Sequence, residues 1–341
     1  MTSLIPIRFQ ELFSLQKMGI SPNNISFGYV TMESDKYIVV RETVGDSSQA
    51  VVINVANPTD ILRKPISADS VMMHPVSRIL ALKLVKNLQI FDLELKSKIK
   101  AYSGTEDVKF WTWINSNTIG FVTDVSVYHW TLSGDPAPTK VFDRHSTLQS
   151  TEIISYRSNA DGKFLLLVGI SSKDSRIVGA MQLYSTERKV SQAIEGHAAC
   201  FVQFKLEGNP HPSSLVCFSL RNAAGGKLHI VEVSQTPAGN QQFPKKAIDV
   251  VYPADAASDF PLSMQSFLPR SIPIFLPVAY SNEDSKNTHT DRQTRVFLFV
   301  PFVLSGVCLS VSSVLSVQVR PSFVRPCLSV RVRVCLSEFV R

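Results

Sequence analysis

The chain has 341 residues, of which 44% are hydrophobic and 18% charged, a balance that excludes a mainly disordered protein. The net charge of +7 is unevenly placed. Residues 266–341 hold nine Lys or Arg and four Asp or Glu, giving +5, so residues 1–265 carry only +2. The basic character is therefore mainly a property of the C-terminal part, and we do not interpret it as a nucleic-acid-binding surface.

The cysteines and the N-terminal residues indicate which metal or redox sites, and which cellular compartment, the protein can have. The five cysteines include no C-x-x-C pair, so we expect no zinc site, no redox pair of that kind and no cofactor. Few thiols in a large β-rich chain indicate a reducing compartment. The start, MTSLIPIRFQEL, reaches Arg8 and Glu11 before any apolar core, so we expect no secretory signal.

Short apolar segments separated by polar turns follow one another through residue 265, and none has a convincing helical period. This pattern predicts an all-β domain. The expected strands lie at residues 4–9, 26–32, 37–41, 50–55, 61–66, 71–73, 79–84, 110–114, 118–123, 125–132, 153–156, 164–170, 178–184, 201–205, 215–220 and 228–233.

The most regular stretch is residues 87–102, NLQIFDLELKSKIKAY. Side chains alternate in a strand, so Leu88 and Ile90 point one way and Gln89 and Phe91 the other. A break after Phe91 precedes lysines at every second position. The stretch predicts a β-hairpin with a polar, basic rim.

Similar short sequence segments recur along the chain and define a repeat. They begin at Val51, Leu88, Val127, Met181 and Leu228, with spacings of 37, 39, 54 and 47 residues. Strand-rich units at about 40–50 residues are typical of a β-propeller, in which each unit builds one four-stranded blade. We therefore predict a propeller-like domain at 1–265, of the seven-bladed type but incomplete, with about six blades.

Residues 266–341 differ in character. Near-copies of Cys-Leu-Ser recur at Cys308, Cys327 and Cys335 with no regular period, so we expect a low-complexity, unstructured tail. An alternative is a membrane anchor, because residues 296–319 carry no charge over a length that can span a bilayer. The tail could also belong to a non-functional truncated product.

Two motifs suggest catalysis or nucleotide binding only weakly. Residues 223–228, AAGGKL, lack the first glycine and the hydroxyl residue of a phosphate-binding loop. Asp143, Arg144, His145 and Ser146 are sequence neighbours, whereas catalytic triads assemble in space. We therefore expect structural turns at both places and no enzymatic activity.

The rim of the hairpin is the better candidate site. Phe91 suits an apolar pocket, Gln89 can bond a peptide backbone, and Lys96 and Lys98 can hold an acidic end. The alternative is that lysines on a strand edge serve solubility and block edge pairing.

Several stretches together resemble the N-terminal domain of the clathrin heavy-chain family. They are MTSLIPIRFQE, TMESDKYIVVRE, RKPISADS, LQIFDLELKSKIKAY, FDRHS, GAMQLYSTERKVSQAIEGHAA, GGKLHI and GNQQFPKKA, and the resemblance runs to about residue 265. It implies a seven-bladed propeller that binds short linear motifs of endocytic and sorting adaptors, with no enzymatic activity.

The resemblance also implies three peptide sites. The clathrin-box groove between the first two blades matches at Gln89, Phe91, Lys96 and Lys98, with substitutions at Lys64, Leu80 and Asn87. A second site is implied at Phe27 and Ile154, where Glu152 adds a negative charge. A third is implied by Leu183, Arg188 and Gln192, with Phe164 in place of the family's tryptophan.

The implied setting is the cytoplasmic face of coated pits and coated vesicles. Expected partners are adaptor and accessory proteins that carry clathrin boxes, with membrane contact only through adaptors and no nucleic acid. The resemblance ends near residue 265, before the family's helical leg and trimerisation hub. We therefore expect neither trimers nor light-chain binding from this chain, and an open propeller ring.

Overall fold

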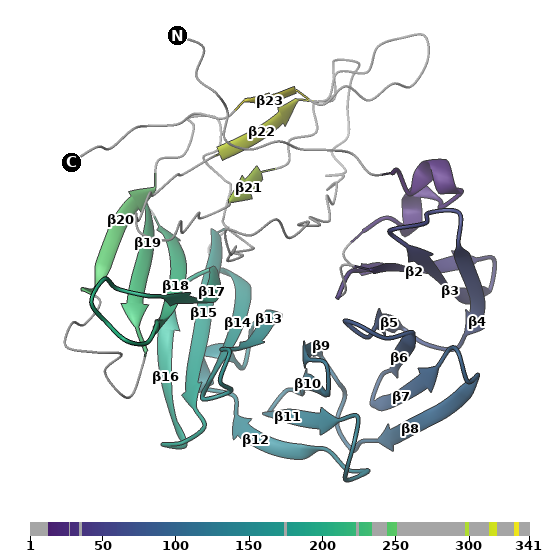
Figure 1. Ribbon diagram of the computed structural model, residues 1–341, viewed down its shortest axis with the longest axis horizontal. Coiled ribbons are helices and arrows are strands. Elements are labelled where there is room, and N and C mark those ends of the chain that lie inside the picture. Colours follow the sequence, from purple (N-terminus) through teal and green to yellow (C-terminus); the bar gives the residue numbers. More distant parts are fainter. Residues whose placement is uncertain are drawn as a thin grey trace. The chain divides into compact units, whose positions relative to one another are not determined.

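The structure, a computed structural model, describes residues 13–26, 28–33, 36–173, 176–222, 225–233 and 244–250, and the backbone of three short strands nearer the C-terminus (Figure 1). The chain divides into two compact units at Val141 and Phe142.

The first unit holds two four-stranded sheets and most of a third, all antiparallel with neighbouring strands in sequence order. The strands are β1 (Val30–Thr31), β2 (Tyr37–Val44), β3 (Ser47–Asn54) and β4 (Ile61–Ile66); β5 (Ser70–Met73), β6 (Ile79–Leu84), β7 (Asn87–Asp92) and β8 (Ser97–Ser103); and β9 (Phe110–Asn115), β10 (Thr118–Val122), β11 (Ser126–Thr131) and β12 (Thr139–Asp143), with the unit boundary inside β12. Two 3-10 helices, η1 (Gln16–Met18) and η2 (Pro22–Asn24), precede them.

The second unit holds two further sheets of the same kind and the 3-10 helix η3 (Ser146–Leu148). Its strands are β13 (Glu152–Ser158), β14 (Phe164–Lys173), β15 (Arg176–Ser185) and β16 (Val190–Glu195), then β17 (Ala198–Phe204), β18 (Ser213–Asn222), β19 (Gly225–Glu232) and β20 (Lys246–Val250). The described residues contain no α-helix. Repeated four-stranded antiparallel sheets confirm the all-β, propeller-type fold.

The sequence repeat corresponds to one strand of each sheet. Val51, Leu88, Val127, Met181 and Leu228 lie in β3, β7, β11, β15 and β19, the third strand in every case. All five positions are buried or half-buried. The recurring sequence segment therefore marks the third strand of each sheet, which is buried to a similar degree in every blade.

Apolar clusters fill the spaces between successive sheets within a unit. Between the first two sheets, Val39, Ala50 and Val52 pack with residues of β5 and β6 such as Met73. The opposite face of the second sheet contributes Leu88 and other side chains to a cluster with the tryptophans of the third sheet. The second sheet is thus apolar on both faces, because it packs against a neighbouring sheet on each side.

Buried polar side chains fasten one sheet to the next. His74, which is 3% exposed, lies with Nε2 2.5 Å from the carbonyl oxygen of Ser116, and its Nδ1 accepts the Val76 and Ser77 amides. In the second unit, Asn159 donates from Nδ2 to Ser214 Oγ at 3.3 Å. Both residues begin the turn between the first two strands of a sheet. This turn therefore makes the polar contact with the next sheet.

The C-terminal part holds three short strands, β21 (Phe297–Phe299), β22 (Val314–Gln318) and β23 (Arg331–Arg333), which pair as an antiparallel sheet. Two of them fall inside the 296–319 segment considered as an anchor. The rest of 266–341 lies outside the described residues, so the domain division remains a prediction. A sixth blade would also need residues outside the described ones.

Candidate functional site

The outer part of the interface between the first two sheets carries most of the predicted site. We call it the first seam, with β4 on one side and the strands β7 and β8 on the other. Leu80 of β6 lies opposite Phe91 of β7, and Phe91 lies opposite Lys98 of β8. Directly opposed side chains share a face of a sheet. The structure therefore brings these three residues into one row, as the sequence predicted for Phe91 and Lys98.

Exposure changes along this row. Leu80 is 3% exposed and belongs to the apolar cluster, Phe91 is half-buried, and Lys98 is exposed. Gln89, two residues before Phe91 on the same strand, shares that face and is exposed. Along the row, Leu80 is a buried apolar side chain, Phe91 is a partly exposed aromatic ring, and Lys98 is an exposed cation.

The turn between β7 and β8 places the second lysine. Asp92 Oδ1 accepts the Glu94 and Leu95 amides at 2.8 and 2.9 Å, an arrangement that short acidic side chains favour in turns. Lys96 closes the turn at φ 53° and is exposed. A register shift between Ile90 and Phe91 then brings Lys98, rather than Ile99, opposite the aromatic ring.

The strand β4 forms the facing side of the first seam. Lys64 lies opposite Ala50, which belongs to the shared cluster, so its side chain stands on the face that packs toward the second sheet. Leu62 and Ile66, two residues away on either side, pack against that cluster, whereas Lys64 is exposed. Sequence reasoning missed Leu62 and Ile66, although their alternation with Lys64 gave a usable signal.

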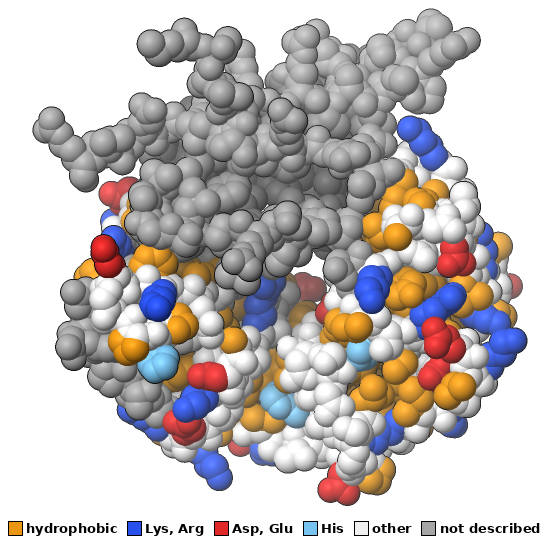
Figure 2. Space-filling view, viewed as in Figure 1, with side chains coloured by type: hydrophobic (Ala, Val, Ile, Leu, Met, Phe, Trp, Pro, Cys, Tyr) orange, Lys and Arg blue, Asp and Glu red, His pale blue; other side chains and the backbone are white. Residues whose placement is uncertain are grey.

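Asn87 lies at the start of β7, on the face that carries Gln89. Its Oδ1 accepts a hydrogen bond from Ser103 Oγ at 2.7 Å. The first seam therefore presents amide, aromatic and lysine groups on one strand pair. On the face shown in Figure 2, Lys and Arg side chains (blue) are interspersed with Asp and Glu (red).

A comparable arrangement occurs between the two sheets of the second unit. Leu183 of β15 lies opposite Gln192 of β16 and packs against a cluster that includes Leu166 and Phe218. Phe164 stands two residues from Leu166 on the same face and is 9% exposed, so it is largely buried. Gln192 is exposed. Three of the four predicted residues of the third site therefore share one face.

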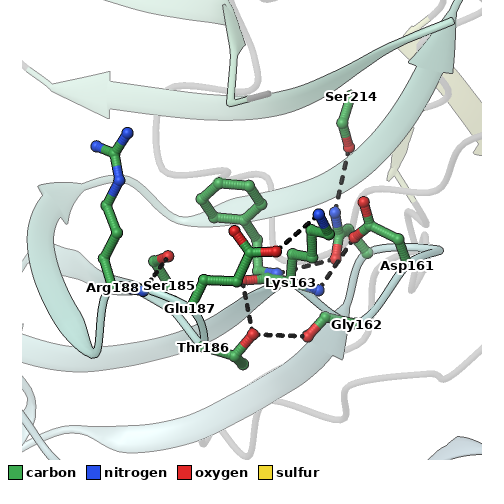
Figure 3. A network of polar contacts seen from close by, with 10 residues as sticks. Asp161, Gly162, Lys163, Ser185, Thr186, Glu187, Arg188 and Ser214 are labelled. Atoms are coloured by element: carbon green, nitrogen blue, oxygen red, sulfur yellow. Dashed lines mark hydrogen bonds and ion pairs between the residues drawn. The ribbon is translucent and has the colours of Figure 1, made fainter. Parts of the chain in front are cut away.

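Arg188, the fourth residue of that site, lies in the turn before β16. The turn is held by a Lys163–Glu187 ion pair of 2.7 Å and by Thr186 Oγ1, which donates to the carbonyl oxygens of Gly162 and Lys163 at 3.2 Å (Figure 3). The Arg188 amide donates to Ser185 Oγ at 3.3 Å, while its guanidinium extends away from this network. The cation is thus exposed on a fixed turn.

The second predicted site is only partly described. Phe27 lies outside the described residues. Glu152 is exposed at the start of β13, and Ile154 lies at the register shift of that strand and packs against the same cluster as Leu183. The grouping of Phe27, Glu152 and Ile154 as one site stays a prediction.

Comparison with known proteins points to one family. The model of the clathrin propeller repeat matches residues 198–234, the part of the chain that forms β17 to β19. "Probable clathrin heavy chain 1" of Caenorhabditis elegans is 59% identical over 261 residues, which are 76% of this chain. "Clathrin heavy chain 2" of Homo sapiens is 54% identical over 265 residues, which are 78% of this chain. The matched part of the chain belongs to the clathrin heavy-chain family.

The match covers 16% of the length of each of these clathrin heavy chains. Among solved structures, the N-terminal domain of Nup159 is similar over 67% of this chain and 66% of its own, with 11% identity and a TM-score of 0.38. No helix in the described part of the chain is long and apolar enough to cross a membrane. Within that same part, no group of three or more His, Cys, Asp or Glu could hold a metal ion.

Proposed function

We propose that this chain is a clathrin coat component whose propeller-type region binds short linear motifs of endocytic and sorting adaptors. The setting would be vesicle-mediated protein transport, at the cytoplasmic face of coated pits and vesicles. Membership of the clathrin heavy-chain family supports the coat role. The row from Leu80 through Phe91 to Lys98 is the single observation that carries the peptide-binding role. Peptide capture of this kind requires no catalytic step and no cofactor.

An extended peptide with alternating apolar residues and an acidic end fits the chemistry of the first seam. Its apolar side chains would rest against Phe91 and the partly buried Leu62 and Ile66, while its backbone bonds the Gln89 amide. The acidic end would lie near Lys96 and Lys98, with Lys64 on the facing strand. Leu80 would support Phe91 from within the core and would not touch the peptide.

The expected affinity is low. Exposed ion pairs contribute about 0.2–1 kcal/mol each and are screened by salt. One backbone hydrogen bond adds roughly 0.5–1.5 kcal/mol. Useful binding would therefore depend on several motifs on one adaptor that engage several sites at once, because linkage raises the effective concentration. The third site could supply such a second contact through Arg188 and Gln192.

The test is a fluorescence anisotropy titration of a labelled acidic-box peptide, at low and at moderate salt. The Lys96→Glu, Lys98→Glu double variant should weaken binding more than the neutral pair Lys96→Gln, Lys98→Gln, because it adds repulsion. A matched control is Lys173→Glu with Lys205→Glu, which changes the net charge equally at exposed lysines at the end of β14 and just after β17. Equal affinity of both charge-reversed variants at low salt would remove the support for this site.

A further inference from the structure

Two cysteines face each other directly inside the last described four-stranded sheet. Cys200 of β17 is the cross-strand partner of Cys217 of β18. They are 1% and 3% exposed and lie in an apolar cluster with Ala198, Leu215 and Ile230. Neither cysteine belongs to any of the three candidate peptide sites.

The position of the pair suits a disulfide. Directly opposed residues of an antiparallel pair have Cα atoms about 4.5–5.5 Å apart. A disulfide accepts Cα separations of about 4.4–6.8 Å, so these strands need no large backbone movement to be bridged. The bridge would enclose residues 201–216, which contain the end of β17, the turn and the start of β18.

The surroundings of Cys200 favour its reactive form. Its pKa is lowered from the ordinary value chiefly by a hydrogen bond from the Cys217 thiol and also by the positive charge of Arg157, while burial acts in the opposite direction. The thiolate is the nucleophile in cysteine chemistry. A thiolate at Cys200 can therefore attack an oxidant, and Cys217, its direct cross-strand partner, is placed to react with the product.

We propose that Cys200 and Cys217 form an oxidation site, at which a small hydroperoxide converts the two thiols into a cross-strand disulfide. The Cys200 thiolate attacks one peroxide oxygen, the O–O bond breaks, and a sulfenic acid forms as hydroxide leaves. The Cys217 sulfur then attacks the Cys200 sulfur, its S–O bond breaks, and the departing hydroxide takes the Cys217 proton to become water. The hydroxide released in the first step takes the proton that Cys200 lost on ionising. Two thiols thus lose two electrons in total, and one peroxide is reduced to two waters.

Burial of the pair determines which oxidant can act. Hydrogen peroxide is small enough to enter a closely packed sheet during local opening, whereas a bulky disulfide oxidant would have to fit a mixed disulfide between Leu215 and Ile230. The same packing limits attack on the finished bond by bulky thiols. The site should consequently oxidise with peroxide and be reduced slowly.

The experiment uses the full chain with Cys308, Cys327 and Cys335 replaced by Ser, so that only the two sheet cysteines remain. The folded protein is treated with hydrogen peroxide, its remaining thiols are alkylated, and it is digested with trypsin. Cleavage after Lys189, Lys205 and Arg221 separates the two cysteines into peptides 190–205 and 206–221. We expect a linked species of the two peptides that dithiothreitol removes, and a reversible rise in Tm.

The matched control is Cys200→Ser in the same background, which keeps Cys217 and should give neither the linked species nor the rise in Tm. A second sample is oxidised in denaturant, where proximity no longer depends on the sheet. Linkage that forms only in denaturant, or no linkage in either sample, would overturn the proposal. Linkage in the folded sample that exceeds the denatured one would support it.

Discussion

Leu80 and Phe91 are directly opposed across β6 and β7, yet Leu80 is 3% exposed within an apolar cluster whereas Phe91 is half-buried. In the proposed site, Leu80 would therefore stabilise the core while Phe91 would contact the peptide. Replacement of each residue should separate the two effects.

Leu80→Ala should lower the free energy of unfolding by about 2–5 kcal/mol, because it leaves a cavity in a packed core. Phe91→Ala should cost less stability, since its ring is already partly open to solvent. It should nevertheless reduce acidic-box peptide binding. Urea unfolding midpoints and peptide titration together check this pair. Loss of stability in Phe91→Ala as large as in Leu80→Ala would show that Phe91 is a core residue.

Gln89→Ala should weaken peptide binding by about 1 kcal/mol, roughly fivefold in Kd, if its amide bonds the peptide backbone. Gln203→Ala provides the control, because Gln203 is also exposed on a strand but belongs to β17 of another sheet. Calorimetric titration measures both. The same Kd for the two variants would mean that Gln89 makes no such bond.

Gly179→Ala should destabilise the second unit by about 1–3 kcal/mol through overpacking. A Cβ at Gly179 would lie 2.2 Å from the carbonyl oxygen of Gly196, which is backbone and cannot swing aside. Gly28→Ala is the matched control, since a Cβ there has no atom within 4 Å. Thermal melts of both variants test this, and equal Tm values would contradict the close approach of Gly179 in β15 to Gly196, which follows β16.

Histidine burial should make the fold sensitive to mild acid. Burial lowers the pKa of His129 to about 4, and it lowers the pKa of His197, whose Nδ1 accepts the Arg221 amide. The unfolded chain takes up protons near pH 6.5 while the folded chain does not, so stability is full above pH 6.5 and falls toward pH 4.

His129→Gln should flatten this dependence of the unfolding free energy between pH 6.5 and 4. His211→Gln is the control, because His211 is exposed. Chemical unfolding at a series of pH values provides the measurement. An unchanged slope in His129→Gln would show that this histidine is not held neutral by the fold.

Most inner strands, and the outer strand β4, could be predicted from the sequence because their apolar residues alternate or run together. The bounds of residues 61–66 and 79–84 agree with β4 and β6. The outer strands β12, β16 and β20 were missed, and β16 shows why, since five of its six residues are exposed and give no periodic signal. The predicted strand at 26–32 shrinks to β1, because the Ser26 carbonyl accepts the Tyr29 and Val30 amides in a turn.

At the first seam, the candidate residues within one hairpin could be placed from the sequence. The residues whose position depends on packing between two sheets could not. Alternation alone placed Gln89 and Phe91 on one face. The register shift beside Phe91, which selects Lys98 over Ile99, has no local sequence signal. The position of Lys64 beside a shared cluster depends on contacts with residues distant in sequence, and it was available only through the family resemblance.

Hydrogen exchange measured with and without an acidic-box peptide tests the central claim most directly, because it locates the bound peptide on the chain. We predict slower exchange in Ile61–Ile66 and in the segment from Asn87 to Ser103. The Lys96→Glu, Lys98→Glu variant should lose that protection at the same peptide concentration. Protection confined to other segments, such as those around Arg188 and Gln192, or identical protection in the variant, would contradict peptide binding at the first seam.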